Sequence, residues 1–161
     1  MQNKLIQFRA ATAADYDVVF DLFSESQLLH YDAHPEFFKT PSKDKFFLGF
    51  YDRILKSEDH DLILGYLKGD SIGFIQFFKG MRPETIYAPE HLVLYVNQLV
   101  VKKGYRYQRH GEAFIDYVKQ IARSLEIKRI GIDFWLFNES ARKCFTRQGF
   151  RAFQEVMWLQ I

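Results

Sequence analysis

The sequence of 161 residues contains a single cysteine, Cys144. One cysteine cannot form a disulfide within the chain, and it cannot build a metal site from several thiolates. The sequence also lacks repeats, low-complexity stretches and an interdomain linker, and its length is usual for one domain. We therefore expect a single domain over residues 1–161 and no metal site.

Long hydrophobic runs are missing as well. None approaches the roughly 18 residues that a membrane-spanning helix needs. Residues 1–9 contain no apolar segment of the length found in secretory signal peptides. The sequence thus predicts a soluble, cytoplasmic protein that does not partner with a membrane.

Neither sign of charge is in large excess, because the chain has 22 Lys and Arg residues and 20 Asp and Glu residues. No polybasic run appears, so the charge pattern predicts no nucleic acid partner. Aromatic residues, in contrast, make up 17% of the chain, with 17 Phe, 9 Tyr and 2 Trp. The core, or a pocket, must therefore contain many large side chains.

Hydrophobic periodicity and turn residues predict alternating strands and helices. The predicted strands are 5–9, 61–67, 71–78, 91–101, 128–136 and 150–161, and the predicted loops are 79–90 and 102–111. Two helices are predicted to start at residues 12 and 112, and two more are predicted over 47–54 and 138–147. The first helix is expected to end at residue 34, because residue 35 is a proline. An antiparallel front half followed by alternating strands and helices indicates an α/β or α+β fold.

The loop 102–111 is basic, contains two glycines and leads from a strand into a helix. The first N–H groups of a helix lack partners and carry partial positive charge, so they bind phosphate where the backbone can be approached. Gly111 and Ala113 would permit that approach, although Gly111 can equally serve only the turn. No Gly-Lys-Ser/Thr and no G-x-G-x-x-G occur here, which excludes a P-loop and a dinucleotide fingerprint.

Residues 108–113, Gln-Arg-His-Gly-Glu-Ala, resemble the Q/R-x-x-G-x-G/A signature of the GNAT superfamily of N-acetyltransferases. Residues 138–150 resemble its second signature, with an Asn, an Ala three positions later and a closing Gly-Phe. Residues 6–12 are similar to the opening strand of that family. The resemblance covers nearly the whole chain and is strongest over residues 97–150.

The resemblance implies a mixed, mostly antiparallel central sheet flanked by helices. Two splayed parallel strands, 91–101 and 128–136, would form a cleft for acetyl-coenzyme A. The residues it assigns to the cofactor are Leu99, Val100, Val101, Gln108, Arg109, His110, Gly111, Glu112, Ala113, Asn138 and Phe145. Asn138 can also serve as a plain helix cap, a role that asparagine favours.

The resemblance implies transfer of an acetyl group to a primary amine of a small-molecule or protein acceptor. The chain departs from the family pattern at the catalytic positions. Phe145 stands where the usual tyrosine acid lies, and Asn97 and Gln98 stand where a carboxylate is often found. Neither amide can act as a base near neutral pH, and the neighbouring Cys144 fits a small core residue better than an acid.

The sequence leaves open which groups replace the missing catalytic acid and base. The base could be relayed by water or supplied by His30, His34, Asp32 or Glu36 from the segment after the first helix, or these can be solvated residues of that segment. Tyr95, Tyr105 and Tyr107 are candidate acids. The aromatic residues between 31 and 51 line an acceptor pocket or fill the core, and the basic residues of 102–109 attract phosphates or form a solvated face.

The leading hypothesis is an acetyl-coenzyme A-dependent N-acetyltransferase. A coenzyme A-binding module with weak or no catalysis is the alternative, since the acid and the carboxylate are both missing. A nucleotide-binding domain of another kind is a third interpretation. Relatives in the family often pair, so a homodimer is a further expectation.

Overall fold

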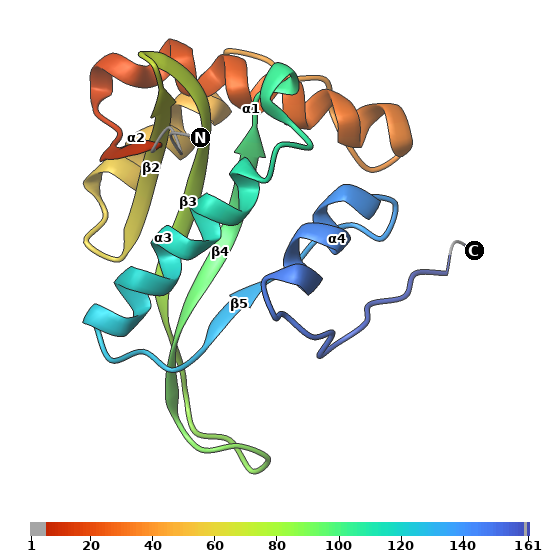
Figure 1. The fold of residues 1–161 in the computed structure, drawn as a ribbon. Helices are drawn as coiled ribbons and strands as arrows, with labels where there is room; N and C mark the ends of the chain where they lie inside the picture. The colour runs from red at the N-terminus through yellow and green to blue at the C-terminus, as the bar shows by residue number, and fades with distance from the viewer. Residues whose placement is uncertain (1–5, 160) are drawn as a thin grey trace.

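The computed structural model describes residues 6–159 and 161. Five strands form one sheet in the order β1-β2-β3-β4-β5 (Figure 1). Neighbouring strands are antiparallel except β4 and β5, which run parallel. The strands are β1 (Gln7–Ala10), β2 (His60–Leu67), β3 (Asp70–Arg82), β4 (His91–Val101) and β5 (Ile130–Ile132).

Four α-helices flank this sheet, which confirms the predicted fold class. They are α1 (Tyr16–Ala33), α2 (Lys45–Lys56), α3 (His110–Ser124) and α4 (Glu139–Arg147), with short 3-10 turns η1 (Ala13–Asp15) and η2 (Lys103–Tyr105). Asp44 caps α2, because its carboxylate accepts hydrogen bonds from the N–H groups of Phe46 and Phe47. As predicted, α1 ends next to the His34-Pro35 step.

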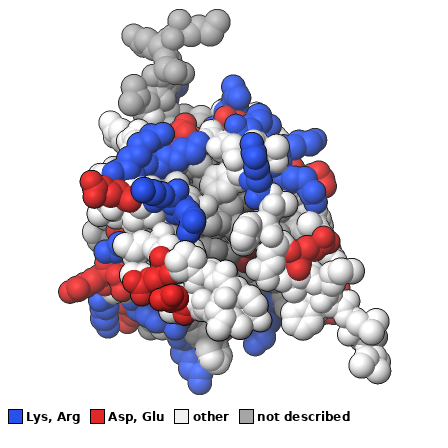
Figure 2. Space-filling view, turned by 90° about the horizontal axis from the view of Figure 1, so that it is seen from below, with Lys and Arg blue, Asp and Glu red and all other residues white. Residues whose placement is uncertain are grey.

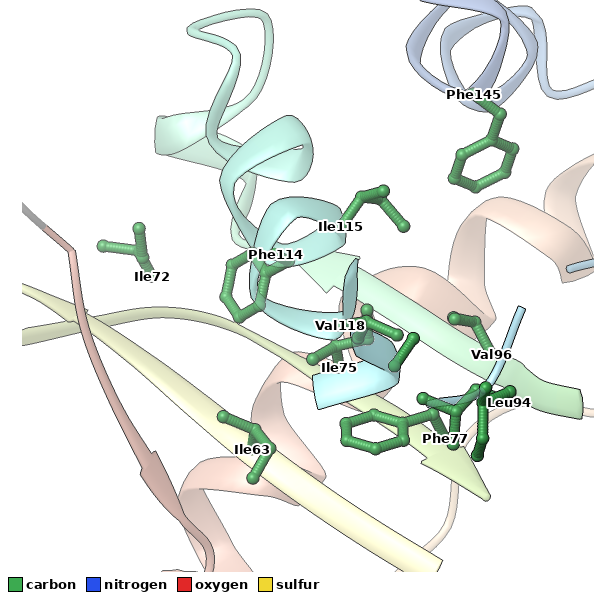
Figure 3. Packing of buried hydrophobic residues seen from close by; sticks show 12 residues of the cluster. Ile63, Ile72, Ile75, Phe77, Leu94, Val96, Phe114, Ile115, Val118 and Phe145 are labelled. Carbon is green, nitrogen blue, oxygen red and sulfur yellow. The ribbon is translucent and has the colours of Figure 1, made fainter. Parts of the chain in front are cut away.

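Each face of the sheet is buried by helices (Figure 1). On one face, Phe114, Ile115 and Val118 of α3 are fully buried and point onto the strands (Figure 3). On the other face, α1 and α2 supply a second cluster around Tyr51, which is 1% exposed. A sheet covered on both sides explains the continuous apolar runs of β2 to β4.

The ladder between β3 and β4 is interrupted at one point. Phe77 pairs with Val96 and Gln76 pairs with Gln98, so Asn97 is an extra residue without a partner in β3. Such a bulge bends its strand and increases the local twist. It falls at the position where β4 and β5 stop pairing.

Several predicted boundaries are wrong. The loop predicted over 79–90 is shorter, because β3 continues to Arg82, and α3 begins at His110, two residues earlier than predicted. The strand predicted over 128–136 reaches only Ile130–Ile132, since the bulge in β4 separates the two strands beyond that point. Leu5 and Gln160, which fall in predicted strands, lie outside the described residues.

The final strand predicted over 150–161 is also wrong for the residues that the structure describes, because none of them is paired. Gly149 adopts φ +90° at the end of α4, and the N–H of Phe150 donates to the carbonyl of Phe145. This left-handed cap turns the chain away from β5. The tail then leaves the body (Figure 1), and Trp158 is 80% exposed.

Candidate active site

A pocket of about 230 Å³ opens between β4 and the segment that follows β5. Helix α1, Phe38 of the segment after it, and helix α4 with its cap residue Asn138 contribute the rest of its wall. The lining residues are Phe23, Ser26, Gln27, His30, Phe38, Val96, Asn97, Gln98, Leu99, Val100, Ile132, Asp133, Phe134, Trp135, Asn138, Ala141 and Phe145. The two parallel strands predicted to flank a cleft therefore do so.

The pocket exists because the two strands separate. Their ladder consists of three pairs and ends at Val96 and Ile132. Over the part of the chain that the structure describes, residues 97–101 have no strand partner on that side. The backbone groups on that side of residues 97–100, which line the pocket, border a space that an extended, amide-containing ligand can enter, because such a ligand can pair with them as a strand would.

Helix α3 begins at the end of the loop that follows β4. Tyr107 and Arg109 both adopt a left-handed conformation, with φ of 62° and 65°. Arg109 is the N-cap residue, and its side chain makes no capping hydrogen bond. Left-handed residues next to a helix start orient successive N–H groups inward, which makes a concavity for anions. Strain at two non-glycine residues in one loop is typical of a binding site.

Charged side chains surround this helix start. Glu112 accepts hydrogen bonds from Arg109 Nε at 3.1 Å and from Arg147 Nε at 2.7 Å. Partial burial raises the pKa of Glu112, but the bonds from Arg147 and Arg109 outweigh burial and leave the pKa below its ordinary value. The carboxylate therefore stays ionised and holds two guanidinium groups beside the loop.

The face seen in Figure 2 carries both basic and acidic side chains, so no single sign covers it. Within the described residues, no helix is long and apolar enough to cross a bilayer. The same residues contain no group of three His, Cys, Asp or Glu side chains placed to hold a metal ion.

Gly111 faces the protein interior. A Cβ atom at this position would lie 3.3 Å from Cys144 Sγ and 3.9 Å from a methyl group of Leu99. The glycine therefore allows α3 to pack closely against α4 and β4. Cys144 is itself packed against the core, and burial raises the pKa of its thiol, in agreement with a core residue.

Among the strand residues assigned to the cofactor, Leu99 and Val100 line the pocket. The carbonyl of Val101 accepts a hydrogen bond from Arg106 Nε at 2.8 Å, so the fold already uses that group. In the loop, the side-chain amide of Gln108 donates a hydrogen bond to the backbone carbonyl of Gly104. His110 packs against Tyr105, and burial lowers the pKa of its imidazole.

Asn138 caps α4, because its Oδ1 accepts a hydrogen bond from the N–H of Ala141 at 3.0 Å. It also lines the pocket, so the cap and a ligand role are compatible: Oδ1 serves the helix while the Nδ2 donor remains. Phe145 lines the same pocket and is 6% exposed, packed between Phe134 and Phe150.

His30 is the one candidate base that the structure brings to the pocket wall. Its Nδ1 lies 2.7 Å from the carbonyl oxygen of Ser26. A carbonyl only accepts, so Nδ1 carries the proton and Nε2 keeps a free lone pair. His34 does not line the pocket and instead pairs with Glu36 at 3.1 Å.

The tyrosine candidates are not brought to the pocket. Tyr95 packs on Gly131 and Phe78, and burial together with the charge of Asp133 raises the pKa of its phenol. Tyr105 donates to Asp70 at 3.0 Å, and Tyr107 is 89% exposed. None of the three lines the pocket.

Sequence reasoning missed Asp133 and Trp135, which line the pocket beyond the end of β5. Both were placed inside a predicted strand. The usable signal was their position at the carboxyl end of a parallel strand, where ligand-binding residues gather in sheets of this kind.

A model of the acetyltransferase (GNAT) family matches residues 25–150. A mutant of the BH1408 protein from Bacillus halodurans aligns over 96% of this chain and 99% of its own, at 16% identity with a TM-score of 0.89. AAC(6')-Iy in complex with a bisubstrate analogue, CoA-S-monomethyl-acetylneamine, aligns over 98% of each chain at 13% identity with a TM-score of 0.74.

The aminoglycoside antibiotic 6'-N-acetyltransferase AAC(6')-IG from Acinetobacter haemolyticus covers 96% of this chain and 97% of its own, at 12% identity with a TM-score of 0.73. No curated protein sequence matches the chain. Identities this low show a common fold, whereas the family model extends over most of the chain and includes both signature segments. The chain belongs to the GNAT family of acetyltransferases.

Proposed function

We propose that the protein transfers an acetyl group from acetyl-coenzyme A to a primary amine. The observation that carries the proposal is the pocket between β4 and β5, where two parallel strands pair over only three positions. The left-handed loop before α3 stands at the end of the same strand. A long ligand with amides along its arm and a diphosphate at its end fits both features.

Acetyl-coenzyme A would supply an activated thioester carbonyl. The unpaired stretch of β4 at Leu99 and Val100 would bind the amide-containing arm, and the Nδ2 group of Asn138 would donate to it. The first N–H groups of α3, with Arg109 and Arg147 close by, would hold the diphosphate. The bulge at Asn97 would aim backbone N–H groups at the oxygen that becomes negative during transfer.

His30 would take the proton of the acceptor. Its Nε2 has a free lone pair and the residue lines the pocket. The amine nitrogen then forms a C–N bond to the carbonyl carbon while the C–S bond of the thioester breaks. Because Phe145 has no proton to give, the departing sulfur would take its proton from water, and the imidazolium of His30 would return a proton to the hydroxide that remains. Acid catalysis typically contributes about 10²–10⁴-fold, so we expect slow turnover.

Two proteins with a similar fold, AAC(6')-Iy and AAC(6')-IG, are named aminoglycoside acetyltransferases, which supports an amine acceptor. A second candidate, a coenzyme A-binding module without turnover, is favoured by one observation. Phe145 and Gln98 line the pocket at the positions where the family usually places the acid and the carboxylate.

The test combines calorimetry with detection of free thiol. Coenzyme A should bind, and acetyl-coenzyme A should release thiol when a panel of primary amines is added. Binding without release from any amine would leave only the binding module. Thermal stabilisation by ATP but not by coenzyme A would overturn both and favour another nucleotide-binding function.

A matched pair of variants tests the role of Asn138. Asn138→Asp retains an oxygen that can cap α4 but loses the amide donor, whereas Asn138→Ala loses both. We expect the aspartate variant to keep the thermal midpoint and to bind coenzyme A several-fold more weakly. Unchanged affinity in both variants would remove Asn138 from the proposed site.

A further inference from the structure

An aromatic cluster borders the pocket on the side of α1. We call it the aromatic rim, and it consists of His30, His34, Phe37, Phe38, Trp135 and Phe137. Phe38 and Trp135 meet edge to face with ring centres 4.7 Å apart, and both line the pocket. The ring of His30 lies 5.0 Å from Phe38 and 5.5 Å from Phe137. The proposed base is thus held inside an aromatic wall.

The aromatic rim is not a closed core. Phe37 is 56% exposed and Trp135 is 40% exposed, although large aromatic side chains usually bury most of their surface. Exposed aromatic surface that continues into a pocket marks a binding site for an apolar body. The rim and the proposed base share one wall, so such a body would lie next to the reacting nitrogen.

The charge of the pocket is small. Among the lining residues that the structure describes, Asp133 is the only carboxylate, and no lysine or arginine is present. One carboxylate can compensate one ammonium group. A ligand with three or four ammonium groups would leave most of them without a partner after losing their water, which is strongly unfavourable.

We propose that the acceptor is an amine with a single positive charge and a flat aromatic body. Asp133 would attract the ammonium group, and Phe38 and Trp135 would hold the ring. This inference rests on the proposed function, because it concerns the acceptor of the same reaction. It separates the protein from enzymes that acetylate polycations, whose sites need several carboxylates.

The experiment compares 2-phenylethylamine with spermidine and neamine as acceptors for the purified full chain and acetyl-coenzyme A. Thiol release should give a kcat/KM for 2-phenylethylamine at least tenfold above that for either polyamine. Trp135→Ala should lower this kcat/KM at least tenfold, mainly through KM. Phe46→Ala is the matched control, because Phe46 is 73% exposed on α2 and does not line the pocket.

Calorimetry with coenzyme A alone separates the two hypotheses. If coenzyme A does not bind, the proposed function fails. If it binds and spermidine or neamine is acetylated as efficiently as 2-phenylethylamine, only the acceptor inference is overturned. Binding with no release from 2-phenylethylamine, or a Trp135→Ala variant as efficient as the wild type, overturns the inference as well.

Discussion

Gln76 of β3 lies directly opposite Gln98 of β4, beside the bulge at Asn97. The Oε1 atom of each side chain is buried and, among the described residues, accepts no hydrogen bond. Gln76 is fully buried and its Nε2 lies 3.0 Å from His60 Nδ1. An unpaired buried oxygen destabilises a fold by about 1–3 kcal/mol, so this pair is a local weakness at the pocket wall.

Replacing Gln98 with methionine should therefore stabilise the protein. We expect Gln98→Met to raise the free energy of unfolding in urea by about 1 kcal/mol, because it removes the unpaired oxygen at nearly constant volume. Gln76→Met is the matched variant, and it should gain less because it also loses the hydrogen bond to His60; of the two glutamines only Gln98 lines the pocket. Coenzyme A affinity should change only in Gln98→Met, and a change in both would indicate a general distortion of the sheet.

Restoring the missing acid should accelerate turnover. Phe145→Tyr adds a hydroxyl to a ring that lines the pocket, where it can protonate the leaving sulfur. We expect kcat to rise about 10²-fold, the low end of acid catalysis, measured as thiol release. Phe150→Tyr is the control, since Phe150 packs behind Phe145 and does not line the pocket. An unchanged kcat in Phe145→Tyr would show that another group already protonates the sulfur.

His30 of α1 and His34, the residue that follows α1, should behave differently. His30 lines the pocket with its Nε2 lone pair free, and His34 lies one turn later and outside the lining. His30 is placed to accept the proton of the amine, so His30→Gln should lower kcat/KM, measured as thiol release, about 10²-fold. His34→Gln should leave kcat/KM nearly unchanged. An unaltered kcat/KM in His30→Gln would rule out His30 as the base.

The ion pair between Arg9 and Asp15 should make stability depend on pH. Hydrogen bonds from Arg9 at 2.7 and 2.8 Å hold the pKa of Asp15 far below its ordinary value, although burial opposes them. Asp15 therefore stabilises the fold above its unfolded-state pKa of about 3.9, and this contribution is lost as the pH falls through the lower folded-state pKa.

At neutral pH, Asp15→Asn should lower the free energy of unfolding by about 2–3 kcal/mol, in the range for hydrogen bonds to charged groups. Urea unfolding at pH 7 and pH 3 should show the difference from wild type shrinking at the lower pH. Asp17→Asn, which removes an exposed pair with Lys43, should cost much less, because water screens an exposed ion pair. Equal losses in the two variants would contradict the assignment.

Arg109→Gly distinguishes the effect of backbone strain at the start of α3 from the effect of the positive charge of Arg109. Glycine adopts φ 65° without the cost of about 1 kcal/mol that an L-residue bears, so the free energy of unfolding should not fall. Coenzyme A affinity should fall several-fold because one cation beside the loop is lost. Lys68→Gly makes the same change at φ 56° in the β2–β3 turn and should leave affinity unaltered. An affinity loss of the same size in both would mean that the effect is not local.

Local patterns in the sequence were sufficient for most helices. The His34-Pro35 step ended α1, the amphipathic spacing over 112–125 predicted α3, and the β-branched and aliphatic content of 91–101 predicted β4 with both its limits. These signals act over a few residues, through helix dihedrals, caps and one buried face. The two family signatures are equally local, and they led to the fold and the family that the comparison confirmed.

Features that depend on a partner far away in the sequence were not determined in this way. Residues 150–161 have the composition of a strand, but a strand forms only where an edge accepts its backbone groups, and the turn at Gly149 leads the tail away from β5. The bulge at Asn97, the pocket and the placement of His30 beside Phe38 and Trp135 arise from the packing of distant segments. The order of residues by itself determined most of the helices and strands and the family they build. Only the tertiary structure decided whether the last segment joins the sheet and which side chains meet at the pocket, because contacts between distant residues follow from packing and not from local spacing.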